Sequence, residues 1–208
     1  LTTVQRIELS NDFVSQESPL KSVLKSDMEN IRATLEKINH KTFDDVVDNI
    51  FKADKIYIIG LRSSTAIADF LGFYLNLILD NVKVVGYGIS DIFEQMINLT
   101  SNDLVIGIGS PRYAVRTIEA LAFAKSRNAK VVAITDSLLS PLAARADYTL
   151  IAQSNMTSFV DSLVAPLSVI NALVIAVGLQ EKEKISSTFS NLETIWQEYE
   201  VYSLKDQN

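Results

Sequence analysis

The sequence KIYIIGLRSST, residues 55–65, is a short apolar run that ends in one glycine, one arginine and three hydroxyl side chains. The β-branched and aromatic residues before Gly60 predict a buried strand, and the glycine predicts a tight turn. A helical pattern follows at about 64–79, so the stretch predicts a strand, a turn and a helix in succession. Its arginine and hydroxyls would also suit a bound anion.

The same order of elements recurs along the chain. Short β-rich runs alternate with helical patterns: the runs are 55–59, 82–87, 104–108, 130–135 and 148–152, and the helical patterns are 64–79, 90–98, 112–127 and 140–145. This alternation predicts right-handed βαβ units and a parallel sheet covered on both faces. We therefore expect an α/β fold, a three-layer αβα sandwich whose five-stranded parallel sheet has the flavodoxin-like order 2-1-3-4-5.

Further helices are expected outside this alternation, at about 18–38, 43–51, 162–179 and 181–199. The first begins with Ser18-Pro19, a hydroxyl followed by proline at the first helical position, and carries one apolar stripe. The third has no charged residue and reaches the length of a membrane span. Its proline, serine and asparagine, and its place late in the α/β pattern, favour a buried or subunit-interface helix instead.

The composition limits the classes of function. The 208 residues include 48% hydrophobic and 21% charged residues, which is typical of a globular protein with one core. The formal net charge of -6 opposes nonspecific attraction to nucleic-acid phosphates. No cysteine is present, which excludes disulfides, thiolate metal sites and a cysteine nucleophile and favours the cytoplasm.

In an open parallel sheet, ligands bind beyond the carboxyl ends of the strands, where the strand order reverses. That crevice would lie between the first and third strands, whose exits at 60–65 and 109–113 each offer glycine, hydroxyl and arginine. Helix N-termini, hydroxyl donors and arginine forks together bind phosphate or carboxylate. The predicted ligand-binding residues are Gly60, Arg62, Ser63, Ser64, Ser110, Arg112 and Tyr113, with Thr135 and Ser137 from the exit of the fourth strand. The alternative is that the serines cap helices and the arginines are solvated.

Other chemistry is weakly indicated. The glycine triplet of dinucleotide-binding folds and the Walker lysine are absent, so no nucleotide cofactor is expected, and we predict no metal site. The single histidine, His40, is placed near the end of the first long helix, where a positive charge suits a helix C-terminus. Glu94 and Glu119 are the only plausible carboxylate bases near the crevice. We therefore expect no catalytic residues and no enzyme.

Four stretches carry a family resemblance in order and spacing. They read IYIIGLRSS (56–64), SPRY (110–113), AITDSLLSPL (133–142) and SFVDSLVAPL (158–167). The sequence here resembles the sugar isomerase (SIS) phosphosugar-binding domain, in particular the C-terminal effector domain of the RpiR/MurR group of bacterial transcription regulators. The resemblance runs from about residue 20 to about residue 179. It implies a five-stranded αβα sandwich, self-association, and a phosphosugar held by serines and threonines at strand ends.

The resemblance also implies partners. In that family a helix-turn-helix domain precedes this one, so we expect residues 1–18 to be a linker from it and 19–208 to form the SIS domain with flanking helices. A homodimer or tetramer is expected, with DNA bound only through the preceding domain and no membrane contact. The predicted function is phosphosugar sensing, with the ligand changing dimer geometry. The alternatives are a phosphosugar isomerase or lyase, and a dimerisation module with a vestigial site.

Two motifs depart from the family pattern. The first usually has a second glycine two places after the first, where Arg62 stands here, while Ser64 keeps the usual serine place. The second usually reads Ser-x-Ser-Gly-x-Thr, and the aligned residues are GSPRYA, 109–114, which leaves Ser110 displaced by one. These departures suggest that Arg62 and Arg112 take over part of the anion binding. The ligand would be a sugar phosphate or a carboxylate-bearing sugar acid.

Overall fold

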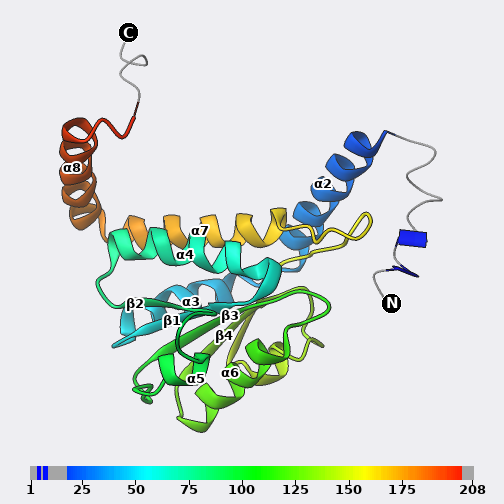
Figure 1. Cartoon of the computed structure of the whole chain (residues 1–208), viewed down its shortest axis with the longest axis horizontal. Helices are drawn as coiled ribbons and strands as arrows, with labels where there is room; N and C mark the ends of the chain where they lie inside the picture. The colour runs from blue at the N-terminus through cyan, green and yellow to red at the C-terminus, as the bar shows by residue number, and fades with distance from the viewer. Residues whose placement is uncertain (1–3, 6, 9–17, 203–208) are drawn as a thin grey trace.

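The computed structural model describes residues 4, 5, 7, 8 and 18–202, and it is an αβα sandwich (Figure 1). Five strands form one parallel sheet in the order β2-β1-β3-β4-β5. The strands are β1 (Ile56–Gly60), β2 (Val82–Val85), β3 (Leu104–Ile108), β4 (Lys130–Thr135) and β5 (Tyr148–Ile151). The predicted fold class and strand order are confirmed.

Helices cover both faces of this sheet, as the all-parallel arrangement requires. The α-helices are α2 (Pro19–Lys37), α3 (His40–Lys52), α4 (Thr65–Ile78), α5 (Ile92–Gln95), α6 (Val115–Ser126), α7 (Val164–Gln180) and α8 (Lys182–Glu198). Two short 3-10 helices are η1 (Arg62–Ser64) and η2 (Ala143–Arg145). One apolar core joins α3, α4 and α7 to one sheet face, and a second joins α5 and α6 to the other. Every residue of β1 and β3 is buried, which explains their uninterrupted apolar sequences.

The edge strand β2 ends at Val85, earlier than the sequence predicts. The Gln95 side chain accepts a hydrogen bond from the Gly86 N–H at 3.3 Å and donates one to the Gly86 carbonyl at 2.7 Å. These bonds satisfy the backbone of Gly86 outside the sheet. The chain therefore leaves the sheet at this glycine, and α5 is shorter than the predicted helix at 90–98.

Asp147 ties the start of β4 to α6. Its carboxylate accepts hydrogen bonds from Lys125 Nζ at 2.6 Å and from the Val131 N–H at 2.8 Å. Partial burial opposes ionisation, but these bonds and the nearby lysine charges hold the pKa of Asp147 below its ordinary value. The carboxylate thus stabilises this end of the sheet in its ionised form.

The long helix α2 carries its apolar stripe on the solvent side. Leu24, Met28 and Leu35 are 54%, 66% and 68% exposed. The buried residues of α2 are polar, namely Asn30 at 0% and Thr34 at 6% exposed. An amphipathic helix normally turns its apolar stripe to the core, so α2 contacts the rest of the chain with the opposite face.

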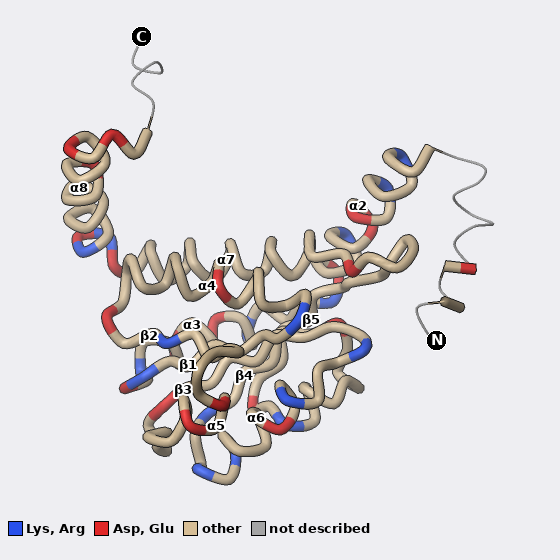
Figure 2. Tube along the Cα trace, viewed as in Figure 1, with Lys and Arg blue, Asp and Glu red and all other residues tan. Residues whose placement is uncertain are grey.

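Helices α2 and α8 project from opposite ends of the layer that α4 and α7 form, toward the same side (Figure 1). No residue of α8 is buried. Helix α7 contains no charged residue (Figure 2) and buries seven of its residues, as the prediction of a buried helix requires. Among the described helices, none alone meets the length and hydropathy of a membrane span; α7 and α8 meet them only as a pair bent by 103°.

The prediction for His40 is wrong. His40 is the first residue of α3, because the Asn39 side chain accepts a hydrogen bond from the Thr42 N–H at 2.9 Å and caps a new helix there. The histidine is exposed and does not line the cavity described below. Of the expected linker at 1–18, residues 1–3, 6 and 9–17 lie outside the described part of the chain.

Candidate functional site

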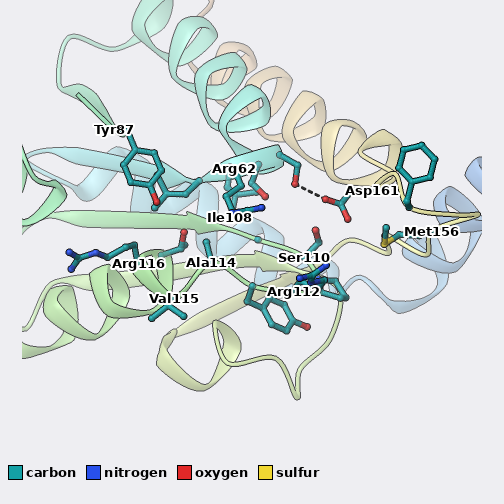
Figure 3. A pocket seen from close by; sticks show the side chains of 18 residues that line it. Arg62, Tyr87, Ile108, Ser110, Arg112, Ala114, Val115, Arg116, Met156 and Asp161 are labelled. Atoms are coloured by element: carbon teal, nitrogen blue, oxygen red, sulfur yellow. Dashed lines mark hydrogen bonds between the residues drawn. The ribbon is translucent and has the colours of Figure 1, made fainter. Parts of the chain in front are cut away.

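A cavity of about 680 Å³ lies at the carboxyl ends of β1 and β3, where the strand order reverses (Figure 3). Its walls come from the β1 exit at 61–64, the β3 exit and first turn of α6 at 108–117, and Tyr87 beyond β2. A fourth wall comes from the segment between β5 and α7, through Met156, Phe159 and Asp161. The predicted crevice is therefore present, and it is bounded by more elements than two strand exits.

Arg62 and Arg112 both have left-handed backbone conformations, with φ of 60° and 66°. Such a conformation disfavours a side chain by roughly 1–2 kcal/mol and is usual for glycine. Both arginines stand at positions where the resemblance described above implies glycine. The two turns therefore combine a glycine-type shape with cationic side chains at the cavity wall. Strained residues of this kind concentrate at functional sites.

The arginines that line the cavity differ in whether an acidic side chain lies close enough to neutralise their charge. Arg116 lies 3.2 Å from a Glu119 carboxylate oxygen and 3.7 Å from one of Asp91, and it stacks on Phe93. For the guanidinium of Arg62, the described residues provide neither a hydrogen bond nor an ion pair. The guanidinium of Arg62 is exposed at the cavity (Figure 3) and keeps its full capacity for an anion.

The hydroxyl groups at the β1 exit do not cap a helix. Ser63 Oγ donates a hydrogen bond to Asp161 Oδ2 at 2.6 Å. Ser64 occupies the N-cap position of α4, yet its side chain makes no capping bond. The alternative that these serines merely cap a helix is therefore not supported.

Within the described part of the chain, no side chain caps the start of α6. Its N-cap residue is Ala114, which has no side-chain acceptor for the first N–H groups. In the first turn, the buried Thr117 hydroxyl has no hydrogen-bond partner within the described part of the chain, and Thr117 lines the cavity. A helix N-terminus with an unsatisfied buried hydroxyl suits an anion.

Six of the nine predicted residues line this cavity, namely Arg62, Ser63, Ser64, Ser110, Arg112 and Tyr113. The Tyr113 hydroxyl donates to Asp136 Oδ1 at 2.7 Å. Burial, and then this bond, raise the pKa of Tyr113 well above its ordinary value. The phenol stays neutral at physiological pH.

The structure does not bring the other three predicted residues to the cavity wall. A Cβ on Gly60 would lie 2.6 Å from the Ser64 carbonyl oxygen, so this glycine permits the turn. Thr135 is buried and donates to Asp136 Oδ1 at 3.2 Å, beside a small hollow that it shares with Ser64 and Ser110. The Ser137 hydroxyl accepts a hydrogen bond from the Leu139 N–H within a local turn.

The lining residues that sequence reasoning missed include Tyr87, Arg116, Thr117, Met156, Phe159 and Asp161. Tyr87 follows β2 and the last three follow β5. The strand-end rule applied to every strand would have included them. Arg116 sits in the first turn of the helix after β3 and carried no separate signal.

The two candidate bases are engaged elsewhere. The Glu94 carboxylate accepts a hydrogen bond from the Asp91 N–H at 3.0 Å in a capping box, and Glu119 pairs with Arg116. Neither glutamate lines the cavity. Across the described residues, no group of three or more His, Asp and Glu side chains is placed to hold a metal ion.

The family model for the SIS domain matches residues 49–176, more than half of the chain. The chain belongs to the SIS domain family. The matched part of this SIS domain runs from α3 into α7 and contains the whole cavity wall described above. The resemblance seen in the sequence is confirmed.

Solved structures indicate which group within the SIS family this chain is similar to. The sugar isomerase domain of an RpiR transcription factor from Sphaerobacter thermophilus is 30% identical, with a TM-score of 0.81, over 86% of this chain and 99% of that chain. The SIS domain thus belongs with the RpiR group. The NanR protein of Vibrio vulnificus, complexed with ManNAc-6P, has a TM-score of 0.72 over 93% of this chain and 75% of that chain. At 22% identity this second likeness shows the fold.

An HTH-type transcriptional regulator of Haemophilus influenzae is 28% identical to the SIS domain over 182 residues. The match covers 86% of this chain and 62% of that relative. The chain therefore spans less than two thirds of the length of this curated relative.

Proposed function

We propose that this SIS domain is the ligand-sensing domain of a bacterial transcription regulator, and that the cavity at the β1 and β3 exits binds an anionic sugar. The observation that carries the proposal is the pair of arginines in glycine-type conformations, Arg62 and Arg112, facing one cavity at the switch point of the sheet. The names of the RpiR and HTH-type relatives support the regulatory role.

The donors of the cavity favour a phosphate or carboxylate group. Ser63, Ser64, Ser110 and the start of α6 supply hydroxyl and backbone donors, and the arginines supply forked charged donors. The complex of the NanR relative with ManNAc-6P supports a sugar phosphate as the leading class. A carboxylate-bearing sugar acid is the second class, because two arginine forks also match a carboxylate.

Thermal unfolding tests this proposal directly. A ligand that binds the folded chain raises its unfolding temperature, so we expect at least one sugar phosphate, ManNAc-6P among those tried, to do so, and its unphosphorylated sugar to do much less. The double variant Arg62→Ala, Arg112→Ala should lose the effect. Arg145→Ala, an exposed arginine outside the cavity, is the matched control and should keep it. Equal stabilisation of the double variant would reject the proposed site.

We propose that the exposed stripe of α2 pairs with a second copy of the chain. Its large apolar residues are Leu20, Val23, Leu24, Met28, Ile31 and Leu35. Exposed apolar patches on this scale mark interaction surfaces. Helices α4 and α7, which lie between α2 and α8 (Figure 1), expose apolar side chains as well: Phe73, Ile175 and Leu179 are each at least 60% exposed. Self-complementary pairing of two such surfaces is what a twofold homodimer requires.

The oligomeric proposal has a simple test by light scattering. Leu24→Glu with Leu35→Glu places charges on the stripe and should convert the dimer to a monomer without unfolding it, since both side chains are exposed. Arg32→Glu on the same helix, outside the stripe, is the control. A wild-type monomer at all concentrations, or an unchanged mass for the stripe variant, would contradict this interface.

We propose that DNA is contacted by another domain of the full-length regulator, in the cytoplasm. In the described part of the chain, acidic and basic residues are interspersed around the molecule (Figure 2), whereas DNA-binding modules gather basic charge on one face. We expect full-length protein to release or bind its operator in response to the sugar phosphate, and residues 1–208 alone to show no operator binding. An isomerase is less well supported, because neither Glu94 nor Glu119 lines the cavity and each carboxylate is bonded to another residue.

A further inference from the structure

The segment 153–162, between β5 and α7, contacts both the cavity and helix α2. On one side Met156, Phe159 and Asp161 line the cavity. Figure 3 shows Asp161 reaching toward the β1 exit, where its carboxylate accepts a hydrogen bond from Ser63 Oγ at 2.6 Å. The segment is thus joined to the proposed ligand site by one charge-assisted hydrogen bond.

The other side of the same segment holds α2. The Asn30 side chain donates to the Asn155 carbonyl at 2.9 Å and accepts from the Asn155 N–H at 3.0 Å. The Gln153 N–H donates to Thr34 Oγ1 at 2.8 Å. Nearby, Ser162 Oγ donates to Asp27 Oδ1 at 2.6 Å, and Lys37 Nζ donates to Gln153 Oε1 at 3.2 Å.

These contacts explain why the buried residues of α2 are polar. Asn30 and Thr34 are buried against the segment, and they satisfy backbone groups that the segment leaves without sheet partners. A displacement of the segment would break these bonds unless α2 moved with it. Because buried hydrogen bonds of this kind are expensive to leave unmade, they favour a movement of α2 together with the segment.

The Ser63–Asp161 bond conflicts with the proposed ligand. The Ser63 hydroxyl has one proton, and Asp161 already accepts it. An anionic ligand at the β1 exit needs the same proton and is also repelled by the carboxylate. Ligand and Asp161 are therefore competitors for one donor.

We propose that Asp161 is a built-in competitor of the ligand, and that its displacement from Ser63 moves the segment 153–162 and with it α2. The proposal rests on the proposed ligand site. It assigns Asp161 as a positioning residue whose contact with Ser63 holds α2 in the arrangement seen here. Because the ligand must displace this contact, the free energy that the contact contributes is lost from the free energy of ligand binding. The cavity is thereby connected to the helix whose apolar stripe we propose as the dimer surface.

Spin labels can test this connection in the whole chain. Because the chain has no cysteine, single cysteines at Lys21 on α2 and Ser101 before β3 accept labels at defined places. Both positions are exposed. The label-to-label distance is measured by pulsed electron resonance with labelled chains diluted into unlabelled ones, with and without inorganic phosphate, and phosphate affinity is measured in parallel.

Three variants give separate expectations. Asp161→Ala removes both the negative charge and the acceptor of the Ser63 bond, so it should bind phosphate about two- to five-fold more tightly and should show, without phosphate, the distance distribution of phosphate-bound wild type. Ser63→Ala should show the same distance change but weaker phosphate binding, because it removes both the contact and a ligand donor. Asp69→Asn, an exposed carboxylate on α4 outside the cavity, is the control and should match wild type in both measurements.

The outcomes separate this inference from the proposed function. Wild-type distances in both Asp161→Ala and Ser63→Ala, or unchanged phosphate affinity in Asp161→Ala, would overturn the competition. Phosphate affinity that does not depend on Arg62 and Arg112 would overturn the ligand site. The distances measured without phosphate still decide whether Asp161 holds α2 through Ser63.

Discussion

Replacing both cavity arginines by glycine should stabilise the chain while removing its ligand affinity. Each left-handed residue carries a strain of roughly 1–2 kcal/mol. Glycine relieves it but adds about 0.4–1 kcal/mol of unfolded-state entropy. The double variant Arg62→Gly, Arg112→Gly should therefore gain about 1–2 kcal/mol. For a chain of this length that gain corresponds to roughly 2–8 °C in unfolding temperature.

The alanine variants separate backbone strain from charge. Arg62→Ala with Arg112→Ala removes the same charges but keeps a Cβ in the left-handed region, so no comparable gain is expected. Asn128→Gly, at another left-handed position with φ of 59°, is the control outside the cavity, with a smaller gain because asparagine tolerates this conformation. The measurement is chemical unfolding, with calorimetric titration of ManNAc-6P alongside. A glycine variant no more stable than the alanine variant would refute the strain argument.

Three further predictions concern single positions. Gly60→Ala places a Cβ 2.6 Å from the Ser64 carbonyl and should lower the free energy of unfolding by about 1–3 kcal/mol, whereas Gly86→Ala, with open space around its Cβ, should lower it much less. Thr117→Val removes a buried hydroxyl without a partner and should stabilise the empty chain by about 1 kcal/mol while weakening phosphate binding. The pKa of Asp147 is lower in the folded chain than in the unfolded chain, where it is about 4. The ionised carboxylate therefore stabilises the fold fully above that pH, and this stabilisation is lost as the pH falls through the folded pKa. The stability difference between wild type and Asp147→Asn, measured from pH 7 to pH 3, should shrink as the pH falls; a difference independent of pH would contradict this.

The sheet could be predicted because each buried strand leaves a signal in its own few residues. Parallel strands buried on both faces need continuous apolar runs, and residues 56–60 and 104–108 supply them without interruption. Strand order followed from the connections. The end of β2 was not predictable, because the bonds from Gln95 to Gly86 join residues on different elements.

The site was predictable in place and less so in detail. The strand-end rule located the cavity and six of its lining residues. It could not show that Arg62 and Arg112 adopt left-handed conformations, because this depends on the turn geometry. Nor could it pair Ser63 with Asp161, which lies 98 positions away.

Periodicity also left the surroundings of α2 undetermined. A stripe recurring at three and four residues predicts a helix and says nothing about what covers the stripe. The polar residues Asn30 and Thr34 decide the orientation, since their partners are backbone groups of the distant segment 153–162. Orientation of this kind needs the tertiary structure.

The proposed anion site can be tested by calorimetric titration of the wild-type chain and of the Arg62→Ala, Arg112→Ala variant with ManNAc-6P and other sugar phosphates. We expect saturable binding of at least one sugar phosphate to wild type, much weaker binding of the same sugar without its phosphate, and loss of affinity in the variant. Binding of equal strength to both proteins, or to both forms of the sugar, would contradict an anion site at the β1 and β3 exits.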